Sequence, residues 1–150
     1  MQKNLILSIL LIMSWLFIKA QDFTEADKVR GIWFTEDNKS TVEIYRAKNG
    51  KYYGKITWLK NPLEEDGTPK VDDQNPDPSK RKEPLIGLLI LKGFEYRGNG
   101  IYKDGTIYDP DNGKTYSCIM TLTDINHLDI RGYIGISLIG RTTEWVRKKQ

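Results

Sequence analysis

Apolar and polar residues alternate with a period of two over most of the chain that follows Gly31. The pattern predicts a strand over 41–45, a tight turn at Asn49-Gly50 and a return strand over 52–58. Strict alternation in the return strand would place Tyr52, Ile56 and Trp58 on one face of the sheet. Because helical periodicity is almost absent, this half of the chain is expected to fold as short antiparallel strands.

The second half repeats the pattern more regularly. Turn residues at 98–100, 104–105 and 109–113 separate short strands. The clearest strand, over 115–122, alternates apolar and polar positions, and further strands are expected over 127–133 and 142–147. About eight to ten strands at this spacing predict an all-β domain, either a small antiparallel barrel or a sandwich. The barrel is favoured because closure removes exposed sheet edges.

Three segments break the alternation. Residues 61–84 hold five prolines and many charges, which predicts an irregular loop, and a loop of this length in a compact domain is more often functional than idle. Residues 85–91 are apolar throughout, so that a strand and a buried helical turn both fit. Residues 22–30 are polar and fit either one helical turn or a flexible lead-in.

The first twenty residues have the pattern of a secretory signal peptide. Lys3 precedes an uncharged run over 5–18, and Ala20 offers a small residue for cleavage. A helix of that length would span about 21 Å, whereas a bilayer core needs about 30 Å, so a cleaved signal is favoured over a stable membrane anchor. We therefore expect a signal peptide at 1–20, one domain at 21–150, and a periplasmic or secreted bacterial protein.

Charge and cysteine content narrow the function classes further. The chain carries 23 Lys and Arg against 20 Asp and Glu, and loss of Lys3 and Lys19 with the signal nearly balances them. The remaining basic clusters are short, which argues against nucleic-acid binding. Cys118 is alone, which excludes an intrachain disulfide and a lipid-modified cysteine at the end of the signal.

Several short motifs together carry a family resemblance. They are Gly31-Ile32-Trp33, Tyr53-Gly54-Lys55-Ile56 with Trp58, Asp73 with Asn75-Pro76, Arg81 with Pro84-Leu85-Ile86-Gly87, Ile107-Tyr108-Asp109-Pro110, Gly113-Lys114-Thr115-Tyr116, Leu128 with Arg131-Gly132-Tyr133, Gly140-Arg141-Thr142 and Trp145-x-Arg147. In order and spacing these motifs resemble the exported bacterial proteins grouped as domain of unknown function 2147, over residues 31–147. The resemblance implies a lipocalin-like (calycin-type) barrel and export, and it brings no established reaction.

The resemblance also implies a plug at one end of the barrel. In lipocalin-like barrels a Gly-x-Trp lies on the first strand, and an arginine from near the last strand lies across the indole. Gly31, Trp33 and Arg147 can fill these roles, with Trp145 alongside. Many relatives carry a cysteine pair around the first hairpin, and residues 49–53 have none, so any disulfide there is absent from this chain.

Inward-facing bulky residues are the candidates for a binding site. A barrel of about eight strands holds either packed side chains or one small ligand, and both possibilities fit the sequence. The candidate lining residues are Tyr52, Ile56, Trp58, Tyr108, Tyr116 and Met120, with Cys118 and Leu122 on the same predicted face. A cavity there would be apolar with a few tyrosine hydroxyls, and would suit a small hydrophobic molecule.

The remaining polar motifs fit structural roles better than metal-binding or catalytic roles. Asp73-x-Asn75-x-Asp77 begins like a calcium loop, but Pro78 and Pro84 stand where glycine and glutamate are needed. His127 is the only histidine, Cys118 is expected to be buried, and no nucleophile elbow, phosphate loop or Cys-x-x-Cys occurs. We therefore expect no metal, no cofactor and no catalytic residue.

Three functions remain open. The first hypothesis is a carrier that binds a small hydrophobic molecule in the barrel. The second is a structural or partner-binding protein of the cell envelope with a filled barrel, and the third is a small hydrolase that uses carboxylates at the rim. A cavity above about 300 Å³ would favour the carrier, and a filled interior would favour the partner-binding protein.

Overall fold

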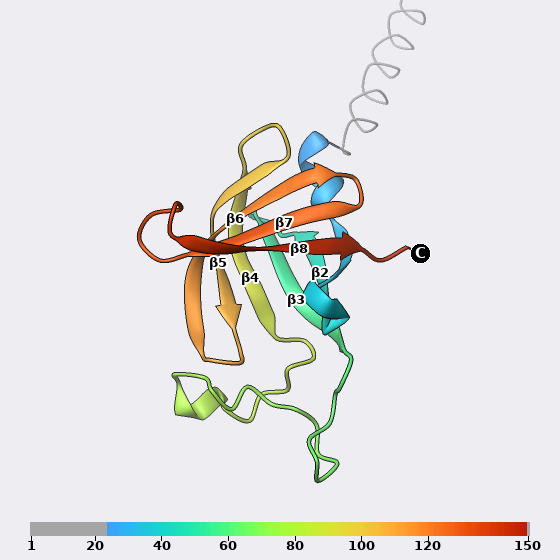
Figure 1. Ribbon diagram of the computed structural model, residues 1–150, viewed down its shortest axis with the longest axis vertical. Helices are drawn as coiled ribbons and strands as arrows, with labels where there is room; N and C mark the ends of the chain where they lie inside the picture. The colour runs from blue at the N-terminus through green and yellow to red at the C-terminus, as the bar shows by residue number, and fades with distance from the viewer. Residues whose placement is uncertain (1–23, 150) are drawn as a thin grey trace, which may run out of the picture.

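Eight antiparallel strands form a closed barrel in chain order, with β1 next to β8 (Figure 1). The computed structural model describes residues 24–149, so the predicted signal peptide at 1–20 lies outside them. The strands are β1 (Gly31–Phe34), β2 (Ser40–Arg46), β3 (Tyr52–Leu59), β4 (Leu89–Tyr96), β5 (Ile101–Asp109), β6 (Lys114–Asp124), β7 (His127–Tyr133) and β8 (Gly140–Arg147). The prediction of a closed antiparallel barrel is confirmed, at the lower end of the expected number of strands.

Helical structure within residues 24–149 is confined to three short 3₁₀ segments. They are η2 (Glu25–Val29), η3 (Glu36–Asn38) and η4 (Pro78–Lys80). The lead-in before β1 is thus one helical turn, and the apolar run over 85–91 divides between a loop and the first residues of β4. No helix in this described part of the chain has the length and apolar character needed to cross a membrane.

The two ends of the barrel differ. At the closed end, short turns join β2 to β3, β4 to β5 and β6 to β7, and η2 lies across them. The open end carries the longer connections, which are the η3 segment, residues 60–88, the β5–β6 turn and the β7–β8 loop (Figure 1).

Trp33 and Arg147 hold the closed end together. The Trp33 side chain is fully buried, and the Arg147 guanidinium carbon lies 4.1 Å from the centre of a Trp33 ring. Trp33 Nε1 donates a hydrogen bond of 2.9 Å to the Val29 carbonyl at the end of η2. Gly31 has a φ of +135°, and a Cβ there would lie 2.6 Å from Arg147 Nη1, so the guanidinium occupies the space that a side chain would fill.

The η2 segment is held in place by Arg147 and by two tyrosines. Arg147 donates hydrogen bonds to the carbonyls of Lys28 and Arg30, on either side of the end of η2. Tyr52 Oη donates to the buried Asp27 carboxylate at 3.0 Å, and Tyr102 Oη donates to the Ala26 carbonyl at 2.7 Å. Burial, and then the bond to Asp27, raises the pKa of Tyr52 to about 12.

The closed half of the barrel is filled by large side chains. Phe94 packs directly on the backbone of Gly105, where a Cβ would lie 2.5 Å from the ring. The fully buried residues that share this core include Tyr52, Leu91, Phe94, Tyr102, Met120 and Leu128. Cys118 is buried among them as a free thiol, as the sequence predicts, and burial raises its pKa to about 12.

The prediction that Trp58 faces the interior is wrong. In the β2–β3 pairing Thr41 lies opposite Trp58 and Val42 opposite Ile56, so that Thr57 is an extra residue in β3. This bulge reverses the alternation of faces beyond Ile56. Trp58 is 42% exposed and packs edge-on against Phe34, with ring centres 6.3 Å apart.

We expect Arg147→Ala and Arg147→Lys both to lower the free energy of unfolding by about 2–3 kcal/mol. Lysine keeps the charge but not the three directed hydrogen bonds that Arg147 donates to the carbonyls of Lys28, Arg30 and Ile125. Trp33→Ala should cost about 3–5 kcal/mol through lost packing. Denaturant titration measures these changes, with the exposed Lys149→Ala as the control. Wild-type stability in Arg147→Lys would contradict a role for the guanidinium geometry.

We expect the Cys118 thiol to react with a disulfide reagent at about pH 8 only after the protein is unfolded, since the buried group stays protonated. The measurement compares absorbance with and without guanidinium chloride. Rapid reaction of the native protein would show that this core opens readily.

Candidate functional site

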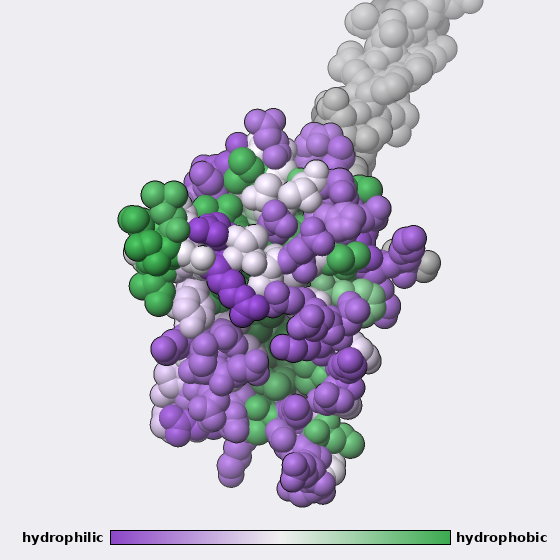
Figure 2. All heavy atoms as spheres, in the orientation of Figure 1, coloured by the Kyte–Doolittle hydropathy of each residue, from purple (hydrophilic) through white to green (hydrophobic). Residues whose placement is uncertain are grey.

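A cavity of about 1010 Å³ occupies the open half of the barrel, and Asn61 and Lys70 of the long connection between β3 and β4 also line it. Figure 2 shows hydrophobic residues in a hollow in the middle of this face, with hydrophilic residues around it. The wall is mainly apolar, and the side chains that form it from the strands are Ile56, Leu59, Ile90, Ile107, Tyr108, Tyr116, Ile130 and Trp145. This volume is at the upper end of the range of ordinary small-molecule sites.

The cavity lies where small residues replace large ones on the inward face. Gly132 on β7 lines the cavity, two positions beyond Ile130. A Cβ at Gly132 would lie at ordinary contact distances, 3.6 Å from Ile107 and 3.7 Å from Tyr116, so no close packing forces a glycine here. Trp145, expected beside the plug, is buried on β8 and also lines the cavity.

The structure divides the predicted lining residues into three groups. Ile56, Tyr108 and Tyr116 lie on the cavity wall. Tyr52 and Met120 are fully buried in the packed core but do not line the cavity, and Trp58 is on the outside. That the three wall residues bind a ligand remains a prediction.

Several wall residues were not among the sequence candidates. Ile130 alternates with Leu128 in a predicted strand, and this period-two signal could have identified it. Leu59 carried no such signal, because it faces inward only after the bulge in β3. Gly132 has no side chain, so a pattern of apolar residues cannot identify it.

The rim of the cavity is charged and uneven. Lys39, Lys60 and Lys70 line it from the η3 side and from residues 60–70, and they form no ion pair within residues 24–149. Glu36 and Arg141 form a salt bridge across the mouth, between η3 and β8. This side of the rim therefore offers unpaired positive charge next to an apolar wall.

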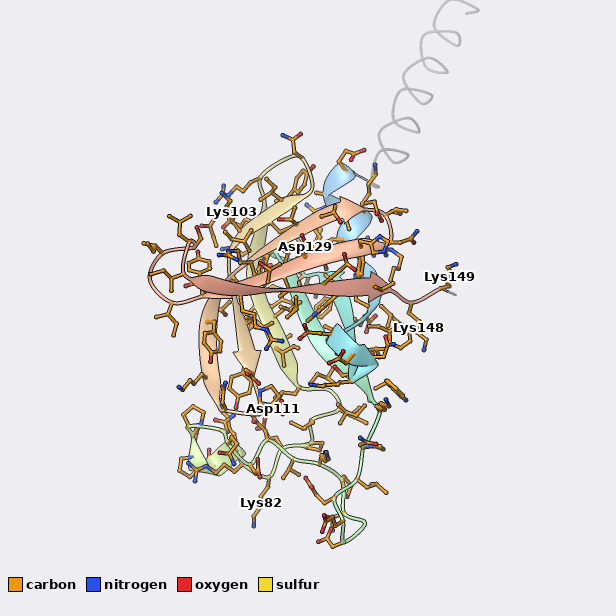
Figure 3. The ribbon with its side chains drawn as sticks, viewed as in Figure 1. Lys82, Lys103, Asp111, Asp129, Lys148 and Lys149 are labelled. Atoms are coloured by element: carbon orange, nitrogen blue, oxygen red, sulfur yellow. The ribbon has the colours of Figure 1, made fainter. Side chains whose placement is uncertain are left out.

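The opposite side of the rim is the β5–β6 turn. The Asp109 carboxylate accepts hydrogen bonds from the Asp111 amide at 3.0 Å and from Asn112 Nδ2 at 2.8 Å. Asp111 lies at the open end, as does Lys82, whereas Lys148 and Lys149 extend beyond β8 (Figure 3). The Asp109 carboxylate therefore stabilises this turn, as the sequence of the turn indicates.

A buried carboxylate attaches residues 61–84 to the barrel. Asp72 is fully buried and accepts hydrogen bonds from Tyr108 Oη at 2.7 Å and from Asn75 Nδ2 at 2.6 Å. Burial, and then the bond to Asp72, raises the pKa of Tyr108 to about 12, so the hydroxyl remains a donor at physiological pH. Tyr108 thereby joins the cavity wall to the loop at 61–84.

The acidic motif at 73–77 has a structural role in this loop. Asp77 caps η4 by accepting hydrogen bonds from the Ser79 amide and hydroxyl, and Asn75 Oδ1 accepts one from the Asp77 amide. No group of three or more His, Cys, Asp or Glu side chains in the described residues is arranged to hold a metal ion.

Comparison with known proteins agrees with this architecture. The family described as "Uncharacterized protein conserved in bacteria (DUF2147)" matches residues 31–147. The chain belongs to this family. Within the solved structures it is similar to protein HP1028 from the human pathogen Helicobacter pylori, which is described as belonging to the lipocalin family. The two are 28% identical with a TM-score of 0.70, over 81% of this chain and 83% of that one. No curated protein matches the chain.

These comparisons confirm the family resemblance and the lipocalin-like barrel that the sequence motifs indicated. The family description assigns no reaction or ligand, so the arrangement of the side chains has to supply the functional argument.

We expect Tyr108→Phe to loosen residues 61–84, because it leaves the buried Asp72 with one donor fewer, at a cost of about 1–3 kcal/mol. The measurement is the rate of trypsin cleavage after Lys80, Arg81 and Lys82. Tyr116→Phe is the control, since its hydroxyl contacts Asn112 on the β5–β6 turn and not Asp72. Equal cleavage rates in the two variants would contradict the anchoring role of Tyr108.

Proposed function

We propose that this family member binds a small hydrophobic molecule in the open half of its barrel. The supporting observation is the cavity of about 1010 Å³ with a mainly apolar wall. Transfer of an apolar ligand from water into such a cavity is favourable by about 25 cal/mol for each Å² of apolar surface removed from water. The rim lysines Lys39, Lys60 and Lys70 are available to a polar end of the ligand.

Two features favour binding over the alternatives. A filled barrel was the expectation for a purely structural or partner-binding protein, and the volume of the cavity argues against it. A hydrolase with two rim carboxylates would need them free to act on a substrate, whereas Asp109 accepts two hydrogen bonds within its own turn. We therefore propose a binding protein rather than an enzyme, without a cofactor.

Export is also part of the proposal. It rests on the pattern of the first twenty residues, with a positive start, an uncharged run and a small residue at Ala20. A carrier outside the cytoplasm would hold a poorly soluble compound in aqueous surroundings. Cleavage after Ala20 or Gln21, read by mass spectrometry of the protein from its own host, would support it.

The binding proposal predicts that a bulky side chain placed in the cavity weakens the affinity for a ligand. In Gly132→Leu the new side chain would project into the cavity from β7, and we expect at least a tenfold weaker affinity for a fluorescent hydrophobic dye, since a bulky group in a binding pocket excludes the ligand. Fluorescence titration measures the affinity, and displacement by a panel of lipids and aromatic compounds defines the ligand class.

Glu144→Leu is the matched control, because Glu144 is exposed on the neighbouring strand β8 and does not line the cavity. We expect it to bind the dye as the wild type does. Unchanged binding by a folded Gly132→Leu variant, or no binding by the wild type across the panel, would refute the carrier function.

A further inference from the structure

The β7–β8 loop presents a cluster of aliphatic side chains to solvent. Of the six residues at 134–139, which we name the aliphatic loop, Ile134, Ile136, Leu138 and Ile139 are 70%, 58%, 85% and 71% exposed. Figure 2 shows this loop as a separate hydrophobic patch at the left edge of the molecule. Single exposed aliphatic residues are ordinary on protein surfaces, but four in one protruding loop indicate an interaction site.

Part of the backbone of the aliphatic loop is hydrogen-bonded within the protein, namely three carbonyls and one amide. Arg131 donates from Nε to the Ser137 carbonyl at 2.7 Å and from Nη2 to the Leu138 carbonyl at 3.2 Å, and the Ile139 amide donates to the Ile136 carbonyl at 3.1 Å. Backbone groups without partners are very costly in hydrocarbon, so this arrangement lowers the cost of bringing the loop into an apolar layer.

The loop is too small for a stable protein interface. Such interfaces use about 20–30 residues from each partner and need a complementary surface. Insertion into lipid needs no complementary surface, and short apolar elements gain affinity simply by burying aliphatic side chains at the boundary between head groups and acyl chains. The size of the patch therefore favours a bilayer over a second copy of the chain or another protein.

The charged and aromatic residues around the aliphatic loop also fit a lipid bilayer as its partner. No acidic residue lies between Asp129 and Glu144 in the sequence. Arg131 and Arg141 stand on either side of the loop, where Arg131 donates to carbonyls of the loop and Arg141 forms a salt bridge with Glu36. Tyr133 directly precedes it, and tyrosine is enriched at the interface between membrane and water. Arginine near a bilayer surface is attracted to anionic head groups.

We infer that the aliphatic loop inserts into the interfacial layer of an anionic lipid bilayer. Ile134 and Ile139 also line the mouth of the cavity, so that insertion would bring the mouth against the lipid. The inference can be tested apart from ligand binding, because Ile136 and Leu138 of the loop do not line the cavity.

A fluorescent label at the tip of the loop tests the inference. The variant Leu138→Cys of the full chain is labelled with an environment-sensitive dye. Cys118 is buried and therefore does not react with the dye. The probes are vesicles of phosphatidylglycerol and phosphatidylcholine in equal parts. We expect a blue shift and a several-fold rise in emission. The control is Ile125→Cys, labelled in the exposed β6–β7 turn at the closed end, which should not respond.

Partition into the same vesicles provides the second measurement. Here the unlabelled protein is sedimented with the vesicles, and the bound fraction gives its affinity for them. We expect the double variant Ile136→Ser, Leu138→Ser to lower this affinity by about tenfold or more. Ile125→Ser with Val146→Ser removes two exposed aliphatic residues elsewhere and should leave the affinity unchanged. Retained dye binding in the cavity by the double variant would show that any loss concerns lipid contact alone.

Three outcomes would overturn the inference. The first is an unresponsive label at position 138. The second is an equal response at positions 125 and 138, which would mean that another part of the chain holds the vesicle. The third is self-association without vesicles that disappears in the double variant, which would make a second copy the partner.

Discussion

The contact between the Trp33 indole and the Arg147 guanidinium is the constraint on which the barrel depends. β1 and β8 must pair to close the sheet, yet their register joins just two residue pairs, Trp33 with Arg147 and Phe34 with Val146. Side chains therefore reinforce a short seam. Arg147 reaches backbone carbonyls before β1 and, through Ile125, in the β6–β7 turn, so that one residue ties three segments together. Without this closure both strands would become exposed edges.

A closed end of this kind allows the two halves of the barrel to differ. Tyr52 and Tyr102 fill the closed half and also hold η2 through their hydroxyls, so the packed core is concentrated there. The other half can then tolerate a hollow interior around Gly132. A cavity costs stability in proportion to its volume, and a small domain can hold one when the packed half compensates.

The open end combines three surfaces of different character. Residues 61–84 are attached through Asp72 and Tyr108, the rim near η3 is basic, and the β7–β8 loop is aliphatic. The aliphatic loop adjoins the cavity, because Ile134 and Ile139 are exposed to solvent and also line the cavity. A carrier that meets a bilayer with this end would exchange its ligand directly with the lipid phase, which links the two proposals through geometry while leaving each separately testable.

The sequence by itself predicted most of the strands and favoured their closure into a barrel. The period of two at 41–45 and 115–122 follows from the backbone pleat, and the positions of Gly31, Trp33 and Arg147 indicated how the ends meet. Pairing between strands decided the rest. The extra residue Thr57 in β3 turned Trp58 outward and Leu59 inward, which no local pattern of apolar residues could reveal, because a bulge depends on the register with β2. The position of the cavity was likewise a tertiary outcome. Tyr52 and Tyr116 look alike in their strands, but the side chains that meet them from distant strands fill one half of the barrel and leave the other open.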